Sequence, residues 1–207
     1  MLFDKEKTID DIILLEFKQF QATQNEGGRA ECQDDFDTFN IMRKSQYLAW
    51  DDDLIKSYYN DLLQAESKPW NLVTEKYARM MESTSPDEYR ALADKLPRRS
   101  AERLNIQEEI IKIRVRQEEE FARQYPNLHD TARPIHTSED TLWDTSFETY
   151  QRGELGTYSD ETVNLYHDMI MRMDKNGENL SEKTVANMVK FYGFDSVKSA
   201  DEYYAQK

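Results

Sequence analysis

Apolar residues recur along this chain at the three- and four-residue spacing of α-helices. The first such face comprises Ile9, Ile12, Ile13, Phe17 and Phe20. Thr8 and Asp11 stand where a capping box could open this helix. We find no convincing strand pattern, no repeat of fixed period and no low-complexity linker. The hydrophobic pattern therefore predicts an all-α chain.

Proline, glycine and capping residues divide the pattern into further helices. They are predicted over residues 34–50, 51–67, 71–82, 86–96, 100–124, 137–152, 159–174, 181–191 and 199–207. Residues 127–134 are expected to be irregular, and Gly153 and Gly156 to mark a turn. The length of 207 residues suits one domain. We therefore expect a single-domain irregular helical bundle of about eight to ten helices, covering residues 1–207.

Charge narrows the classes of partner. The chain carries 41 acidic and 27 basic residues, a net charge of −14. A surface of that sign repels phosphate, so we expect no nucleic-acid partner and no binding to anionic membranes. A single cysteine, Cys32, excludes an internal disulfide framework. The start of the chain lacks the features of a signal peptide, and no stretch is apolar enough to span a bilayer, so a cytoplasmic location is expected.

Two segments are not explained as solvated helix faces: residues 25–35 and residues 133–158. Both are rich in short polar, acidic and aromatic side chains, and both lie at predicted loop-to-helix junctions. Such junctions expose backbone N–H groups and hold side chains in defined positions. They are the candidate functional segments.

Catalytic chemistry is one interpretation of these segments. Cys32 could act as a nucleophile, with His136 as its base and Asp140 as the group that orients the base. The alternative is a packed, unreactive thiol. His136, Glu139, Asp140 and Asp144, with Cys32 or Asp34, could instead bind a divalent metal, although the same acids could simply cap a helix. The metal, if any, and any other cofactor stay unknown.

Ligand binding is the leading hypothesis. Arginines near both segments could grip a carboxylate or phosphate, or could form internal salt bridges. The candidate ligand-binding residues are Arg29, Asp34, Asp35, Arg79, Asp144, Glu148, Arg152 and Tyr158. We expect a polar pocket where segment 29–35 meets segment 133–152, holding a small anionic or zwitterionic metabolite. The sequence leaves open whether the protein also transforms that metabolite.

A non-catalytic interaction or regulatory protein, docking a partner through its acidic helical surface, is the alternative. A binder should bring the polar residues together in a cleft with perturbed ionisation. An interaction protein should instead show an exposed apolar patch and a fully paired polar interior.

Three stretches of the sequence also resemble those of a known family: GGRAECQDDFDTF, NLVTEKYARMMEST and RPIHTSEDTLWDTSFETYQRGELGTYS. They are similar to a bacterial family known only as a domain of unknown function, numbered forty-one twenty-five. The likeness extends over most of the chain. It implies a self-contained bacterial domain and supplies no activity and no catalytic residue.

Overall fold

The computed structural model describes residues 3–24 and 28–206 of the chain. Within those ranges it contains eleven α-helices, three short 3-10 helices and no strand, which confirms the all-α prediction. The α-helices are α1 (Lys5–Ala22), α2 (Phe36–Leu48), α3 (Asp52–Ser67), α4 (Leu72–Thr84), α5 (Pro86–Leu92), α6 (Ala101–Gln124), α7 (Pro126–His129), α8 (Phe147–Thr157), α9 (Asp160–Lys175), α10 (Leu180–Phe191) and α11 (Val197–Tyr204). The 3-10 helices are η1 (Glu31–Asp34), η2 (Ala93–Lys95) and η3 (Thr137–Glu139).

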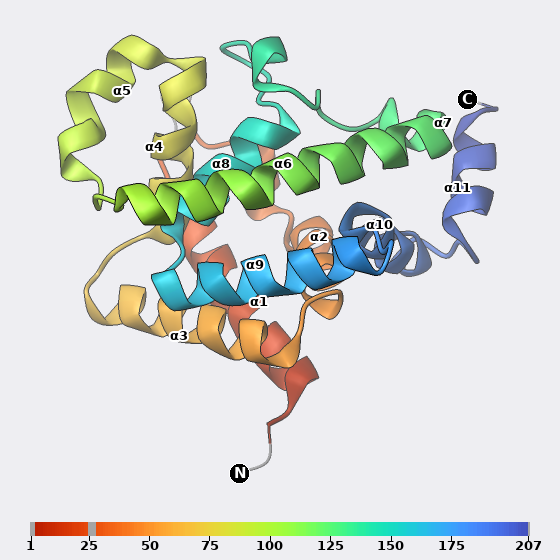
Figure 1. Cartoon of the computed structure of the whole chain (residues 1–207), viewed down its shortest axis with the longest axis horizontal. Coiled ribbons are helices and arrows are strands. Elements are labelled where there is room, and N and C mark those ends of the chain that lie inside the picture. The colour runs from red at the N-terminus through yellow and green to blue at the C-terminus, as the bar shows by residue number, and fades with distance from the viewer. Residues whose placement is uncertain (1–2, 25–27, 207) are drawn as a thin grey trace.

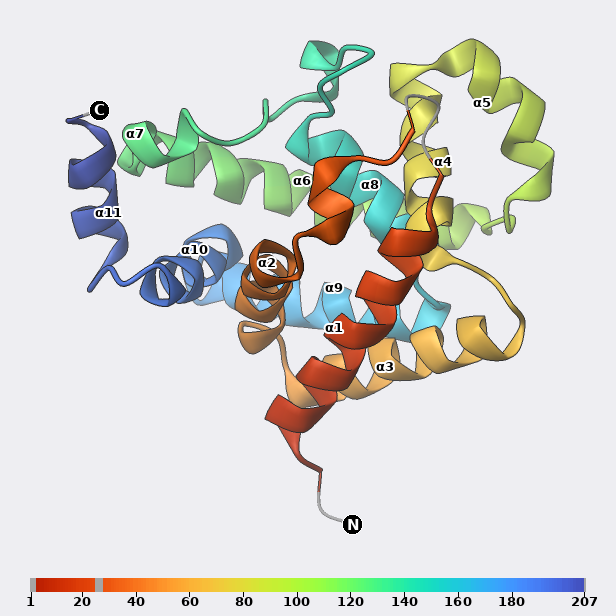
Figure 2. The same ribbon diagram turned by 180° about the vertical axis from the view of Figure 1, so that it is seen from behind.

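The helices pack in two layers. In Figure 1 the long helix α6 lies beside α9, and α9 lies beside α3. Figure 2, from behind, shows α1 crossing these helices, with α2, α4 and α8 on the same side. The main core fills the space between the layers, and a smaller core joins α7, α10 and α11 to the end of α6. The α5–η2 segment arches away from this body before the chain enters α6.

Most helix starts follow the predicted caps. The side chains of Asn71, Ser100 and Ser159 accept hydrogen bonds from the backbone N–H three residues further on, at the starts of α4, α6 and α9. The cap of α1 differs from the prediction: Asp4 accepts the N–H of Lys7. The helix therefore begins one turn earlier than the apolar pattern suggested.

The helix predicted over residues 137–152 is wrong. Thr137 opens only the short 3-10 helix η3, and α8 begins at Phe147, capped by Ser146. The reason is tertiary: the Asp140 carboxylate accepts hydrogen bonds from the hydroxyls of Ser83 and Thr149 at 2.5 and 2.6 Å. It joins the end of α4 to the start of α8 and is not available to cap a helix of its own.

Gly153 and Gly156 do not mark a turn either, because both lie inside α8. A Cβ atom at Gly153 would stand 2.7 Å from Met80 Cγ and 3.0 Å from the Lys76 carbonyl oxygen. One at Gly156 would stand 2.6 Å from Arg79 Cδ. The two glycines therefore allow α4 and α8 to approach closely, which creates the wall between the two cavities described next.

Candidate functional site

A buried ionic cluster, here the Arg43 cluster, lies where α1, α2 and α8 meet. Arg43 bonds through Nε and Nη2 to both oxygens of Glu16, and through Nη1 to Glu154 Oε1 at 2.8 Å. Tyr47 and Tyr58 donate their hydroxyls to Glu16 at 2.7 and 2.6 Å. All five residues are buried. A buried cation with two carboxylates and complete hydrogen bonding is typical of a structural joint.

The ionisation of this cluster follows from its geometry. Burial raises the pKa of Glu154, but Arg43 and Lys76 outweigh it and hold the pKa below its usual value. Burial likewise lowers the pKa of Arg43, while Glu16 and Glu154 raise it well above the ordinary value. Each charge is therefore stabilised by its opposite.

A cavity of about 270 Å³, here the Lys76 cavity, opens beside this cluster. Helices α1, α2, α4 and α8 and the two polar segments line it. Cys32 and Asp35 come from the first segment, and Arg133 and Tyr150 from the second. The predicted meeting of the two segments thus occurs here. The remaining lining is largely apolar and aromatic: Phe20, Phe39, Met42, Val73 and Tyr77.

Lys76 stands apart from the other buried cations. Its side chain is buried and lines the cavity, and its Nζ donates to the Tyr150 hydroxyl at 2.7 Å. The same Nζ lies 4.3 Å from the centre of the Tyr150 ring and 5.2 Å from that of Tyr77. Among the described residues no carboxylate lies within 4.0 Å of it. Lys76 is therefore a buried ammonium held by phenols and π faces, without an ion-pair partner.

Lys76 nevertheless stays charged at neutral pH. Burial lowers its pKa, but Tyr150, Glu154 and Tyr77 together raise the pKa above the usual value of a lysine. Arg133 adds a second positive group at the cavity: its guanidinium carbon lies 4.7 Å from the Tyr150 ring centre, and Nη1 donates to the Thr145 carbonyl at 2.8 Å. Two cations therefore flank Tyr150 at this cavity.

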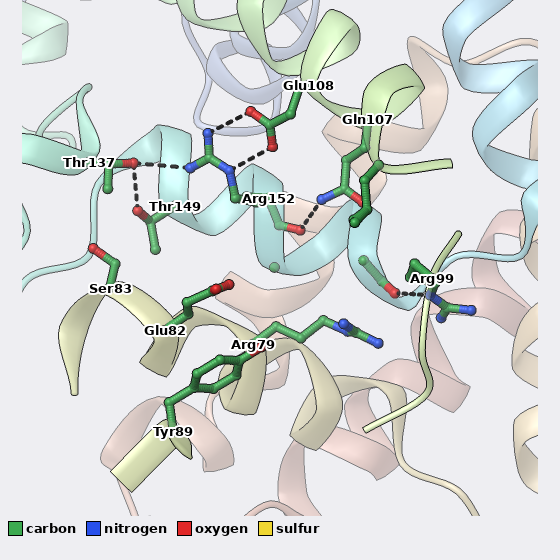
Figure 3. Close-up of a pocket in the computed structure, with 13 residues that line it drawn as sticks. Arg79, Glu82, Ser83, Tyr89, Arg99, Gln107, Glu108, Thr137, Thr149 and Arg152 are labelled. Carbon is green, nitrogen blue, oxygen red and sulfur yellow. Dashed lines mark hydrogen bonds and ion pairs between the residues drawn. The ribbon is translucent and has the colours of Figure 1, made fainter. Parts of the chain in front are cut away.

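A larger cavity of about 600 Å³, here the arginine pocket, lies on the other side of the α4–α8 pair. Figure 3 shows it between α4, α6 and α8, with Tyr89 of α5 reaching in. Three arginines line it: Arg79, Arg99 and Arg152. Arg152 is fully engaged, bonding both oxygens of Glu108 at 2.8 and 2.9 Å. Of the residues that line the Lys76 cavity, none lines this pocket.

The structure does not bring the three predicted catalytic residues together. Cys32 is exposed and lines the Lys76 cavity. His136 lines neither cavity, and its Nε2 lies 3.2 Å from Glu119 Oε1. The Asp140 carboxylate joins α4 to α8 as described above. Although burial opposes it, hydrogen bonds from Ser83 and Thr149 keep the pKa of Asp140 below its usual value.

The other candidate residues are dispersed. Arg29 pairs with Asp34 on the surface, at 2.6 Å. Asp35, at the edge of the Lys76 cavity, caps α2 by accepting the Thr38 N–H. Asp144 is exposed in the loop before α8 and closes a turn by accepting the Thr141 N–H through its carbonyl.

The other four ligand-binding candidates lie on α4 or at α8. Arg79 and Arg152 line the arginine pocket, and Glu148 bonds to Arg152 at 3.0 Å. Tyr158 is buried in the main core. In the described part of the chain, no group of three or more His, Cys, Asp or Glu side chains is arranged to hold a metal ion.

Sequence reasoning missed the buried charges Glu16 and Lys76, whereas Glu154 was expected as a possible salt-bridge partner of an arginine and does pair with Arg43. A signal was available for the first two: Glu16 falls four residues after Ile12, and Lys76 four before Met80, so both occupy apolar faces of their helices. A charged residue at such a position is rarely buried without a partner, which makes it a candidate for a special role.

Comparison with known proteins supports the family resemblance and adds no activity. No helix of the described residues has the length and apolar character needed to cross a membrane. No curated protein and no solved structure matches the chain. The sequence model of the family "Protein of unknown function (DUF4125)" matches residues 6–202, almost the whole chain. The protein therefore belongs to the DUF4125 family.

Proposed function

We propose that the protein is a small-molecule-binding domain whose Lys76 cavity holds a compact organic anion. The observation that carries this proposal is the buried Lys76 ammonium, which faces the cavity and has no carboxylate within 4.0 Å among the described residues. Buried charges in proteins are generally paired, because an unpaired one loses hydration without compensation. A bound anion would supply the missing partner.

The lining indicates the class of anion. Phe20, Phe39 and Tyr77 surround the cavity with aromatic rings, and a volume of about 270 Å³ suits a small ligand. The carboxylate of a planar aromatic acid could accept hydrogen bonds from Lys76, with Arg133 near the ring of Tyr150 as a second positive charge. The ligand class proposed is therefore a compact aromatic or apolar carboxylate.

Binding is proposed without a chemical step. The Glu16 carboxylate, the buried acid nearest the cavity, accepts four hydrogen bonds from Arg43, Tyr47 and Tyr58. It is therefore occupied as an acceptor and unsuited to act as a base. Cys32 is the remaining nucleophile at the cavity, and the predicted base His136 contacts Glu119 instead.

The experiment is thermal unfolding and calorimetric titration with benzoate, succinate and phosphate. We expect benzoate to raise the melting temperature of the wild type, and the effect to vanish in Lys76→Met and to weaken in Tyr150→Phe. Lys18→Met, which removes an exposed lysine of α1, is the matched control and should respond as the wild type. A benzoate effect that persists in Lys76→Met, or none in the wild type, would contradict the proposal.

A second candidate function has one observation in its favour. Leu142 and Trp143, at the tip of the loop before α8, are 63% and 87% exposed. Large apolar side chains at a protruding tip are typical of protein contacts. If the protein acts through a partner, Trp143→Ser should abolish that association, whereas benzoate binding should be unaffected.

A further inference from the structure

The arginine pocket has an end with excess positive charge. Arg79 and Arg99 both direct Nη2 at the same oxygen of Glu75, at 2.7 and 3.5 Å. The other Glu75 oxygen accepts the Trp70 indole N–H at 2.5 Å. Two guanidinium groups therefore share one buried carboxylate. Burial lowers the pKa of Arg99, Glu75 raises it, and the neighbouring Arg79 lowers it again, so that the pKa stays below its usual value. An additional negative charge at this end would therefore stabilise the two guanidinium groups.

The same pocket has an end with excess negative charge. Glu82 lines it from α4, three residues after Arg79, and is exposed. Within the described residues its carboxylate has no hydrogen bond and no ion pair within 4.0 Å. Arg79 bonds to Glu75, one turn in the other direction, and leaves Glu82 without a cation. Figure 3 shows both side chains extending from α4 into the space below α8.

The arginine pocket also has an apolar wall, in addition to its two charged ends. Leu104 from α6 and the ring of Tyr89 from α5 line the pocket, and Gly153 and Gly156 contribute backbone without a side chain. Helix α5 itself has no buried residue, so Tyr89 reaches the pocket from a helix that is open to solvent. The volume of about 600 Å³ exceeds what a single amino acid fills and falls in the range of ordinary ligand sites.

We propose that the arginine pocket binds a short peptide in its zwitterionic form. The carboxylate of the peptide bonds to Arg79 and Arg99, its ammonium pairs with Glu82, and an apolar side chain packs against Leu104 and Tyr89. The inference is independent of the proposed function, because the two cavities share no lining residue and lie on opposite sides of the α4–α8 pair.

The test is calorimetric titration of the full chain with the dipeptide alanyl-phenylalanine, its N-acetyl form and its C-terminal amide. We expect the unmodified dipeptide to bind about ten-fold or more tightly than either blocked form, because each block removes one charge-assisted contact. Glu82→Gln should weaken the unmodified dipeptide about ten-fold and leave the N-acetyl form unchanged.

Two variants serve as controls. Glu88→Gln removes an exposed carboxylate of α5 that does not line the pocket, and it should bind as the wild type does. Lys76→Met should also retain dipeptide binding, which separates this inference from the proposed function. Absence of binding at millimolar dipeptide, equal affinity for the N-acetyl form, or equal effects of Glu82→Gln and Glu88→Gln would overturn the inference.

Discussion

Two buried cations near one another in this protein have opposite surroundings. Arg43 contacts two carboxylates, Glu16 and Glu154, and directs a further N–H at the Tyr47 hydroxyl. Lys76 contacts a phenol and two aromatic rings, and no carboxylate in the described structure lies within ion-pair distance. Burial alone therefore does not identify a functional charge. The absence of a compensating partner, together with an adjoining cavity, is what distinguishes Lys76.

One helix creates this difference. Tyr150 and Glu154 are four residues apart and lie on the same face of α8. The first turn of α8 presents Tyr150 to Lys76, and the next presents Glu154 to Arg43. The glycine contact between α4 and α8 sets the distance from Tyr150 to Lys76, whereas the distance from Glu154 to Arg43 depends on how α8 packs against α2.

Removing the compensated cation should have the largest effect. Arg43→Ala leaves Glu16 and Glu154 buried without a positive partner, and we expect it to lower the free energy of unfolding by about 3–5 kcal/mol. Urea unfolding followed by circular dichroism measures the change. Arg29→Ala, which breaks the exposed pair with Asp34, is the control and should have no measurable effect. Equal stability of the two variants would show that the Arg43 cluster is not a structural joint.

Altering the packing should have an intermediate effect. A Cβ at Gly153 would meet the backbone of Lys76, and overpacking of this kind costs about 1–3 kcal/mol. The better helix propensity of alanine offsets up to about 1 kcal/mol. Gly153→Ala should thus lower stability and, by displacing Lys76 from Tyr150, weaken benzoate binding. A Cβ at Gly156 would meet the flexible Arg79 side chain instead, so Gly156→Ala should lower stability less than Gly153→Ala does. A larger loss of stability in Gly156→Ala would contradict this account of the α4–α8 contact.

Removing the uncompensated cation should affect stability least. Lys76→Met keeps an unbranched chain and breaks no ion pair within 4.0 Å among the described residues, and Glu154 keeps its direct contact with Arg43, so the free energy of unfolding should change by less than about 1 kcal/mol. In the wild type, benzoate affinity should stay constant through neutral pH, because the pKa of Lys76 is raised above its usual value, and should fall only at strongly alkaline pH, where the ammonium loses its proton. A loss of stability as large as that of Arg43→Ala would remove the distinction between the two cations.

The fold was largely predictable because its signals are local. Helices α3, α4, α6 and α9 lie within two residues of their predicted bounds, since apolar periodicity and the caps Asn71, Ser100 and Ser159 act over a single turn. The largest errors fell at residues 137–156; smaller ones are the earlier start of α1 and the short helix α7, which lies in a stretch expected to be irregular. Within residues 137–156, Asp140 bonds to Ser83, more than fifty residues earlier in the chain, and the glycines serve a contact with another helix. Neither interaction leaves a local pattern.

The candidate site was predictable only in outline. The two polar segments do meet at one cavity, through Cys32, Asp35, Arg133 and Tyr150. The predicted anchor Arg29 pairs with Asp34, and His136 with Glu119, outside both cavities. The catalytic assignment stays a prediction. Residues 25–27, which open the first polar segment, lie outside the described residues.

The sequence by itself determined an acidic, all-α chain of the DUF4125 family, because composition, periodicity and caps are properties of short stretches. Only the tertiary structure decided which buried charges are compensated. Glu154 reaches Arg43 across 111 positions and Lys76 reaches Tyr150 across 74. Such pairings depend on how closely α4, α8 and α2 approach in space, and that distance is set by the packing of the whole core.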